Sequence, residues 1–350
     1  MKMNFEIDDA QPPLTGPGEQ WNAAAAQGEV LCGLASFTRK NGQVLPLDIH
    51  FSRPPVHVHV ANELAEFEFR ADALRCTVMS GLGEVYCGRV LSMLPFVLPA
   101  FAASDEGATL AASLGDEGYA GRVLSFSSIV PDFLVPDPYF MSSDGYRAQG
   151  AAFGQAPGWD ERIDRAYWRG TDTGTFRYRN PADAPRIEIC RISLDRPDIV
   201  DARITAIEPH ADAAEKQARY EMLGYLGPYD AQDEIVRYRY QVDIDGNTNT
   251  WSSFFLKLLT GSPVLKVDSE CGFHQWYYAQ LIPYLHYVPV KPDLSNFTTQ
   301  MAWLRANTDQ AKRIGAAGRA FALDLGMATE VNKATATVER LIALNRRVAF

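Results

Sequence analysis

The segment YRYQVDIDGNTNTWSSFFLKLLTGSPVLKV, residues 238–267, contains the pattern that decides the fold. Its first part reads as a strand that ends at Asp245-Gly246, and a short polar turn then leads into a helix. This helix begins near Trp251 and closes on Gly261, and the apolar strand PVLKV follows at once. A strand, a helix and a second strand within about 30 residues form a βαβ unit with two parallel strands.

Strands and helices continue to alternate through residues 165–310. Further strands are predicted at AYWRG and HYVPV, and further helices at APRIEICRISL, WYYAQLIPYL and LSNFTTQMAWLRAN. In the corner HYVPVKPDLSNF, Asp293 and Ser295 read as cap and turn residues of the last of these helices. The alternation is typical of a parallel sheet with helices on both faces, which binds its ligand at the carboxyl ends of the strands.

The N-terminal half has a different pattern, in which short β segments dominate. VHVHV (56–60) alternates, FEFRADALRCTVMS (67–80) reads as two strands around a turn, and EVYCGRV (84–90) reads as another strand. The segments TLAASLG (109–115) and RVLSFSSIV (122–130) are predicted to be strands as well. This half is therefore expected to form a mixed domain.

The change of pattern divides the chain. We predict an α/β protein with an N-terminal domain at 1–155 and a C-terminal Rossmann-like domain at 156–325, which binds the ligand. The last residues, 326–350, have apolar positions at helical spacing and are expected to form a helix that packs back on the first domain.

Composition excludes some classes of protein. The 350 residues carry a formal net charge of −10, which argues against general nucleic-acid binding, because that needs a basic surface. Five scattered cysteines without a CxxC pair favour reduced thiols in a cytoplasmic protein. The acidic N-terminus is unlike a signal peptide, and the longest apolar run (90–103) is too short to span a bilayer. No metal site is expected, since HVH (57–59) lacks a spaced acid or cysteine.

AYWRGTDTGTFR (166–177) is the first stretch that can carry chemistry. A strand delivers Arg169, Gly170 removes a side-chain obstacle, and Thr171 and Thr173 follow in a turn. Arginine donates two parallel hydrogen bonds to phosphate oxygens, and a Gly/Thr-rich turn exposes backbone N–H groups to an anion. The alternative is an ordinary strand exit with a solvated arginine.

The helix start in residues 243–259 is the second candidate. First-turn N–H groups lack partners within the helix and carry the positive end of its dipole, so they can bind a diphosphate. The residues predicted to form this seat are Asn247, Thr250, Trp251, Ser252 and Ser253. Neither GKS/GKT nor GxGxxG is present, and the alternative is a simple capping turn.

Two acidic positions are candidates for other roles. Glu270, after the strand PVLKV, can accept hydrogen bonds from ribose hydroxyls. Asp116 and Glu117 lie in a Gly-flanked turn of SLGDEGYAGRVLSFSS (113–128), where a carboxylate at a cleft can act as a general base. The alternatives are a surface loop for Glu270 and an ordinary turn acid for Asp116.

Several of these stretches together resemble glycosyltransferase family 90, which contains protein O-glucosyltransferases and fungal capsule xylosyltransferases. The resemblance rests on AYWRGTDTG, on DIDGNTNTWSSFFLKLLTGS, and on the run from VLKVDSE through QWYYAQLIPYLHYVPVKPDLSN. It covers residues 105–325, and its HYVPVK-x-DLSN core is the most specific part. The resemblance implies a GT-B-like α/β fold, with two Rossmann-like domains facing a central cleft and extra antiparallel strands in the N-terminal one.

The resemblance also implies the chemistry. Family members use UDP-sugars, invert the anomeric centre and need no divalent metal, so no cofactor is expected. Their general base is an aspartate upstream of a strand that ends in Ser-Phe-Ser, and Asp116 matches it, with Glu117 as the alternative. Arg186 lies on the helix after Arg169, where the family also has an arginine, and joins the predicted nucleotide site beside Glu270.

The chain departs from the family pattern at two places. Asp172 stands where protein O-glucosyltransferases have a second arginine, and Ser252-Ser253 where they have another. The chain resembles a cytoplasmic, bacterial-type member of surface polysaccharide or lipopolysaccharide assembly. The expected partners are UDP-glucose or UDP-xylose and a glycan or lipid-linked glycan acceptor, with association at the inner membrane face left open. The alternative is a non-catalytic nucleotide- or glycan-binding protein.

Overall fold

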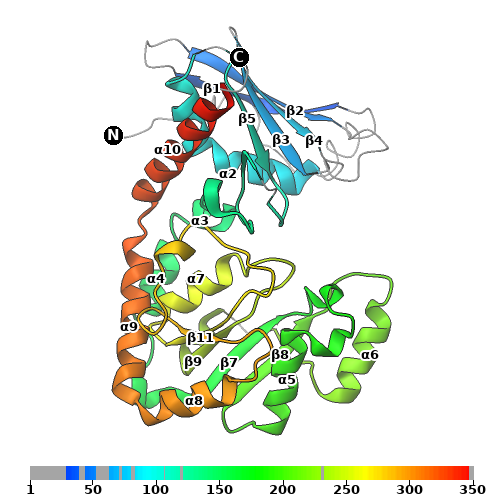
Figure 1. The fold of residues 1–350 in the computed structure, drawn as a ribbon, viewed down its shortest axis with the longest axis vertical. Coiled ribbons are helices and arrows are strands. Elements are labelled where there is room, and N and C mark those ends of the chain that lie inside the picture. Colours follow the sequence, from blue (N-terminus) through cyan, green and yellow to red (C-terminus); the bar gives the residue numbers. More distant parts are fainter. Residues whose placement is uncertain are drawn as a thin grey trace. The chain divides into compact units, whose positions relative to one another are not determined.

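The computed structural model describes residues 29–38, 44–52, 63–70, 73–79, 83–105, 107–118, 121–229 and 232–346. The chain forms two compact units (Figure 1). Unit 1 comprises Met1–Ser142 and Met327–Phe350, and unit 2 comprises Ser143–Gly326.

The division at Ser142 lies upstream of the predicted boundary at 155/156. The reason is helix α4 (Arg147–Phe153), which packs against α7 (Ser252–Leu259) of unit 2. Arg319 Nη2 also donates a hydrogen bond of 2.9 Å to the carbonyl of Gly150 and so ties α4 to unit 2.

Unit 2 is built on a five-stranded parallel sheet in the order β11-β10-β9-β7-β8. Its strands are β7 (Ile163–Thr171), β8 (Val200–Ala206), β9 (Tyr238–Asp243), β10 (Val264–Val267) and β11 (Val288–Val290). The chain first moves outward from β7 to β8 and then returns to run from β9 to β11. The topological switch point, where a doubly wound sheet binds its ligand, therefore lies between β7 and β9.

Helices cover both faces of this sheet (Figure 1). The helices that follow β7 and β11, α5 (Pro185–Asp195) and α8 (Phe297–Ala306), share one apolar core with the sheet. Helix α7 lies on the opposite face, and α6 (Ala213–Leu223) and α9 (Thr308–Asp324) complete the unit. All four residues of β10 are buried, as expected for a strand covered on both sides.

Unit 1 contains a six-stranded mixed sheet in the order β1-β2-β4-β3-β5-β6. The strands are β1 (Glu29–Thr38), β2 (Val44–Ser52), β3 (Leu64–Phe69), β4 (Leu74–Met79), β5 (Thr109–Ser113) and β6 (Val123–Leu124). Three of the pairings, β1–β2, β3–β4 and β3–β5, are antiparallel, and the other two are parallel. The α/β class is therefore confirmed, with antiparallel strands in the N-terminal unit.

Among the described residues of unit 1, three α-helices accompany this sheet: α2 (Gly83–Ala102), α3 (Pro138–Ser142) and the C-terminal α10 (Met327–Arg346). α10 packs against both α2 and β5, so the end of the chain completes the fold of unit 1. Its buried face carries Val331, Ala334, Val338, Leu341 and Ile342.

The prediction of a strand at EVYCGRV is wrong, because this segment is the start of α2. The buried residues Val90, Met93, Val97 and Phe101 recur every three or four positions, and this helical face extends well beyond the short alternation at 84–90. Phe101 packs on Phe67 of β3, with ring centroids 6.4 Å apart.

Two other predicted elements are shorter than expected. RVLSFSSIV pairs as a strand only over Val123–Leu124, because the backbone of Ser125 then bonds to Phe133 and Val135. In WYYAQLIPYL the structure has only a 3₁₀ turn at Tyr278–Gln280, since Pro283 cannot continue a helix and Tyr284 has a φ of 59°. VHVHV lies outside the described residues.

Within the ranges given above, no helix combines the length and the apolar character that crossing a bilayer requires.

Candidate functional site

A pocket opens at the carboxyl edge of the parallel sheet of unit 2, beside the switch point between β7 and β9. The segments that follow β7, β9, β10 and β11 supply its walls. Its lining includes Thr173, Gly174, Arg177, Tyr178, Arg186, Asp245, Gly246, Thr248, Asp268, Ser269, Glu270, Cys271, Phe273 and Pro292. This is the position that the topology predicts for a ligand.

Two glycines let the loops after β7 and β9 touch. A Cβ on Gly174 would lie 2.4 Å from the carbonyl oxygen of Gly246, and a Cβ on Gly246 would lie 2.6 Å from Thr173 Oγ1. Gly174 also has a φ of 84°, which side-chain-bearing residues rarely adopt. Its N–H donates to Asn247 Oδ1 at 2.8 Å. The pocket therefore depends on a close backbone contact that a larger residue cannot make.

Replacing Gly174 by alanine is expected to lower the free energy of unfolding by about 1–3 kcal/mol, because both the φ angle and the contact with Gly246 become unfavourable. Gly272→Ala is the matched control. Gly272 has a φ of 74° but no atom within 4 Å of the added Cβ, so it measures the cost of the φ angle alone. Urea titration of both variants tests the prediction, and equal losses would contradict the role of the contact.

Arg186 on α5 connects the loop after β7 to the loop after β9 by hydrogen bonds. Its Nε donates to the carbonyl of Asp245 at 2.9 Å, Nη2 to that of Ile244 at 3.0 Å, and Nη1 to the carbonyl of Thr171 and to Thr173 Oγ1 at 2.8 and 2.6 Å. Burial lowers the pKa of Arg186, although the nearby acids oppose this. An arginine stays charged under such conditions, so it brings a fixed positive charge to the wall of the pocket.

Arg177 is a pocket residue that was not predicted. Its guanidinium donates to the carbonyl of Asn247 and to Sγ of Cys271 at 3.8 Å, and it lies 5.3 Å from the ring centroid of Phe273. It thereby connects the loops after β7, β9 and β10. Arg177 is the last residue of the stretch AYWRGTDTGTFR and lies eight positions after Arg169, the arginine that was predicted to bind phosphate.

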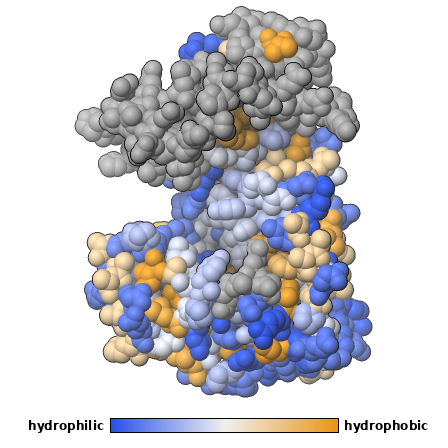
Figure 2. Space-filling view, turned by 180° about the vertical axis from the view of Figure 1, so that it is seen from behind, coloured by the Kyte–Doolittle hydropathy of each residue, from blue (hydrophilic) through white to orange (hydrophobic). Residues whose placement is uncertain are grey.

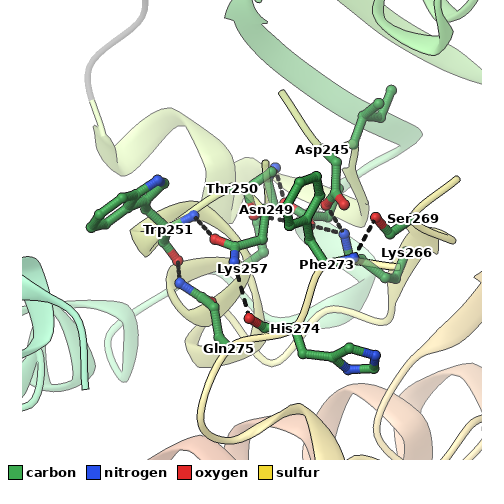
Figure 3. Close-up of polar contacts among 12 residues, drawn as sticks. Asp245, Asn249, Thr250, Trp251, Lys257, Lys266, Ser269, Phe273, His274 and Gln275 are labelled. Atoms are coloured by element: carbon green, nitrogen blue, oxygen red, sulfur yellow. Dashed lines mark hydrogen bonds and ion pairs between the residues drawn. The ribbon is translucent and has the colours of Figure 1, made fainter. Parts of the chain in front are cut away.

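A group of four charged side chains, which we call the buried ion cluster, adjoins the pocket through Asp245, and three of its members are labelled in Figure 3. It consists of Asp243, Asp245, Lys257 and Lys266. Asp243 accepts from Lys257 and Lys266, both at 3.0 Å, and Lys266 also contacts Asp245 at 2.5 Å. Burial opposes the charge of Asp243, but the two lysines outweigh it and lower its pKa to about 2. The contact with Lys266 holds the Asp245 side chain in place at the pocket.

Two polar atoms of the pocket residues are left unsatisfied. Asp245 Oδ2 and Thr248 Oγ1 are both buried without a hydrogen-bond partner among the described residues, and Thr248 is only 2% exposed. Buried polar atoms in native structures almost always have a partner, which can be water or a ligand. These two atoms indicate that the pocket is built to hold a polar molecule.

Carboxylates occupy the β10 side of the pocket. Asp268 and Glu270 both line it, and Glu270 accepts a hydrogen bond from the hydroxyl of Tyr178. Burial and this hydrogen bond raise the pKa of Tyr178, so its hydroxyl keeps its proton at neutral pH. Glu270 was predicted to face a ribose, and the structure places it in the pocket.

Arg169, the predicted phosphate ligand, is not among the pocket residues. Its Nη1 donates to Asp201 Oδ1 on β8 at 2.9 Å, and its guanidinium lies 4.6 Å from the ring centroid of Tyr167. Burial opposes the charge of Asp201, but Arg169 and Tyr238 outweigh it and lower its pKa. Arg169 is therefore paired with the carboxylate of Asp201 within the sheet. Its role in phosphate binding stays a prediction.

The residues around Arg169 shape the exit of β7. A Cβ on Gly170 would lie 2.6 Å from the ring of Trp168, so glycine is needed for packing. Asp172, which replaces a family arginine, is fully buried: Oδ1 accepts from the N–H of Glu208 at 2.7 Å and Oδ2 from the hydroxyl of Tyr220 at 3.4 Å. Asp172 is thus a buried structural acid that links the loop after β7 to α6.

The predicted helix start is organised by side chains that do not line the pocket. Thr250 Oγ1 donates to Asp243 at 3.0 Å, and the N–H of Trp251 donates to Asn249 Oδ1 at 3.0 Å (Figure 3). Trp251 has a φ of 49°, and α7 begins at the next residue, Ser252, followed by Ser253. Asn247 does not line the pocket either, but it links the lining residue Gly174 to Glu208. The two serines are not brought into the pocket.

Asp116 lies in unit 1, in the turn after β5. Arg89 of α2 donates to Asp116 Oδ1 at 3.0 Å, and the aspartate side chain is 44% exposed. Gly118 permits the turn to approach the Ser-Phe-Ser segment, because its Cβ would lie 2.2 Å from the carbonyl of Ser127. Asp116 is therefore an accessible carboxylate on a fixed turn.

The corner after β11 contains local turn contacts. Asp293 Oδ1 accepts from the N–H of Ser295 at 3.0 Å, and Asn296 Oδ1 accepts from the N–H of Lys291 at 2.9 Å. Phe297 then begins α8. These side chains satisfy backbone N–H groups of the turn.

Among the residues that the structure describes, no group of three or more histidine, cysteine or acidic side chains is arranged to hold a metal ion. The HVH pair lies outside the described residues.

Comparison with known proteins places the chain in a family. The family model of glycosyl transferase family 90 matches residues 150–333, which is just over half of the chain, so the chain belongs to this family. The resemblance inferred from AYWRGTDTG and the HYVPVK-x-DLSN core is confirmed.

Curated relatives each match just under half of the chain. Protein O-glucosyltransferase 3 of Homo sapiens is 28% identical over 169 residues, which are 48% of this chain and 30% of that protein. Protein O-glucosyltransferase 1 of Mus musculus is 32% identical over 172 residues, or 47% of this chain and 38% of that protein. The chain thus spans well under half the length of these relatives.

A solved structure with a similar fold is that of Anabaena HepE in complex with UDP-glucose, which is 11% identical and has a TM-score of 0.38. The match covers 55% of this chain and 53% of that chain.

Proposed function

We propose that the chain is an inverting, metal-independent glycosyltransferase that moves glucose, or else xylose, from a UDP-sugar to a glycan hydroxyl. The observation that carries this proposal is the pocket at the switch point of unit 2. It lies within the residues that match the family, and its lining combines arginines with carboxylates.

The charged groups of the pocket suit two parts of a nucleotide sugar, its diphosphate and its ribose. Arg177 and Arg186 supply positive charge for a diphosphate, which arginine binds well because of its planar set of N–H donors. Asp268 and Glu270 accept hydrogen bonds and match the hydroxyls of a ribose. The unsatisfied atoms of Asp245 and Thr248 provide further polar contacts for the ligand.

The reaction assigned here needs a base and a stabilised leaving group. An acceptor hydroxyl attacks the anomeric carbon opposite the departing UDP and loses its proton to a carboxylate, for which we propose Asp116, with Glu117 as the alternative. Fixed donors then stabilise the charge of the leaving diphosphate. This role requires Asp116 to face the donor sugar in the reacting complex.

The acceptor and the place of action follow from the same proposal. A glycan or lipid-linked glycan of surface polysaccharide or lipopolysaccharide assembly is the proposed acceptor, at the cytoplasmic side of the membrane. Protein O-glucosyltransferases, the named relatives, support transfer of a hexose.

The test is turnover with candidate donors. UDP release is measured for UDP-glucose and UDP-xylose with an acceptor glycan, with and without EDTA. We expect release that depends on the acceptor and is unaffected by EDTA. Binding of UDP without any turnover would favour the alternative, a non-catalytic nucleotide-binding protein, and the absence of UDP binding would reject both.

Replacing Arg177 by alanine is expected to raise the dissociation constant of UDP at least tenfold, because a charge-assisted hydrogen bond contributes about 1.5–3 kcal/mol. Isothermal titration calorimetry measures this change. Arg313→Ala on α9 is the control, since Arg313 is exposed and donates its hydrogen bonds to the neighbouring Gln310. An Arg169→Ala variant tests the original prediction in parallel, and a larger loss there than in Arg177→Ala would contradict the assignment.

A further inference from the structure

A second cavity of about 250 Å³ lies in unit 2, between α5, α6 and the 3₁₀ turn at Pro181–Asp183. Its floor is formed by the buried residues Ile187, Tyr220 and Tyr225, and the two tyrosine rings have centroids 6.3 Å apart. Leu223 adds an apolar edge that is 37% exposed. In Figure 2, apolar and charged surfaces lie side by side over the end of unit 2 that carries these helices.

Charged side chains surround this floor. Some of them form ion pairs with neighbouring side chains, and others form none among the described residues. Arg191 is held by Glu188 and Asp195, and Lys216 lies between Asp172 and Asp212. Arg219 makes no hydrogen bond or ion pair within the described part of the chain. The hydroxyl of Tyr225 likewise has no hydrogen bond to the residues that the structure describes. The cavity therefore joins an apolar floor to a guanidinium and a hydroxyl that are both available as donors.

We propose that this cavity, which we call the α5–α6 cavity, binds a small organic anion that contains one or two rings. Its volume lies near the lower end of ligand pockets, which range from about 300 to 1,000 Å³, and this limits the ligand to a small molecule. The ring packs on Ile187, Tyr220 and Leu223. The carboxylate, sulfonate or phosphate group accepts hydrogen bonds from Arg219 and Tyr225.

The α5–α6 cavity is distinct from the switch-point pocket and adjoins it. No residue lines both, but consecutive residues of α5 serve the two: Arg186 lines the pocket and Ile187 lines the cavity. Lys216 and Tyr220 line the cavity and contact Asp172, which lies between Thr171 and Thr173 in the loop after β7. The proposed site thus stands on its own and does not require the proposed glycosyltransferase activity.

The probe for this site is 8-anilinonaphthalene-1-sulfonate, a ring-bearing monoanion whose fluorescence rises in apolar surroundings. We expect it to bind the whole chain, and we expect Arg219→Glu to raise its dissociation constant at least tenfold by replacing an attractive charge with a repulsive one. Arg313→Glu introduces the same change of charge on the exposed face of α9 and is expected to leave binding within twofold.

A second variant keeps the test decisive if Arg219→Glu fails to fold by circular dichroism. Ala182→Phe fills the cavity from the 3₁₀ turn and is expected to abolish probe binding in a folded protein. Excess UDP is expected to leave the probe bound, since UDP is assigned to the other pocket. Probe binding that survives both variants, or that is displaced by UDP, would overturn the proposal, as would a wild-type dissociation constant above about 1 mM.

Discussion

Replacement of Asp243 by alanine is expected to lower the free energy of unfolding of unit 2 by about 3–5 kcal/mol, the usual cost of leaving a buried charge without its partner. Asp243 is completely buried and lies between Lys257 and Lys266. Without it, Lys266 keeps its contact with Asp245, but the buried Lys257 loses the carboxylate that neutralises it. The largest part of the loss is therefore the cost of the buried Lys257 ammonium.

Urea titration followed by tryptophan fluorescence measures this loss, because five of the six tryptophans lie in unit 2. Asp195→Ala is the control: it removes an exposed ion pair with Arg191 and is expected to cost less than about 1 kcal/mol. Similar losses in the two variants would show that the buried ion cluster contributes no more than a surface pair.

The pH dependence gives a second measurement on the same pair of proteins. The pKa of Asp243 is about 2 in the folded protein, below its ordinary value of 3.8. Its ionisation therefore stabilises the fold above about pH 4 and ceases to do so as the pH falls toward 2. We expect the difference in stability between the wild type and Asp243→Ala to shrink over this acidic range and to be constant at neutral pH.

Asp116→Asn is expected to reduce sugar transfer by about two orders of magnitude or more while UDP binding stays unchanged, if Asp116 is the proposed base. Asparagine preserves the shape of the side chain and can still accept the hydrogen bond from Arg89. It cannot take up the proton of the acceptor hydroxyl. Single-turnover assays with saturating UDP-sugar isolate the chemical step.

The neighbouring acid supplies the comparison for this experiment. Glu117→Gln removes a carboxylate from the same turn and is expected to retain transfer within a few-fold. Full activity of Asp116→Asn would remove this residue from the mechanism, and loss of activity only in Glu117→Gln would transfer the role to the alternative acid. In both cases a retained affinity for UDP separates a catalytic effect from a binding effect.

The architecture of unit 2 could be predicted from the sequence because its signals are local. The segment 238–267 has the apolar strands, the polar turn and the closing glycine of a βαβ unit, and the structure contains β9, α7 and β10 in these places. The strand β8 and the helix α6 were not predicted. The contacts that Asp201 on β8 makes with Arg169, and Tyr220 on α6 with Asp172, were therefore not predicted either.

The side chains of the site were harder to predict because their roles depend on neighbouring strands. Arg169 looked suited to phosphate, but Asp201 on the adjacent strand β8 holds it. Arg177 and Thr248 lie in polar turns whose residues show no periodic pattern, and only the contact between loops shows that they share a pocket. The sequence showed Asp172 only as a replacement for an arginine of the family pattern. In the structure, Asp172 accepts a hydrogen bond from Tyr220 and so holds α6 in place.

The placement of α10 has a consequence for how the protein can be divided. Unit 1 is assembled from both ends of the polypeptide, so unit 2 is topologically an insert that begins after Ser142 and ends at Gly326. A fragment that stops at Gly326 would uncover the apolar surfaces of α2 and β5 that Val338 and Leu341 help to bury. The inserted segment, by contrast, can be cut out with two breaks while its own sheet and helices stay whole.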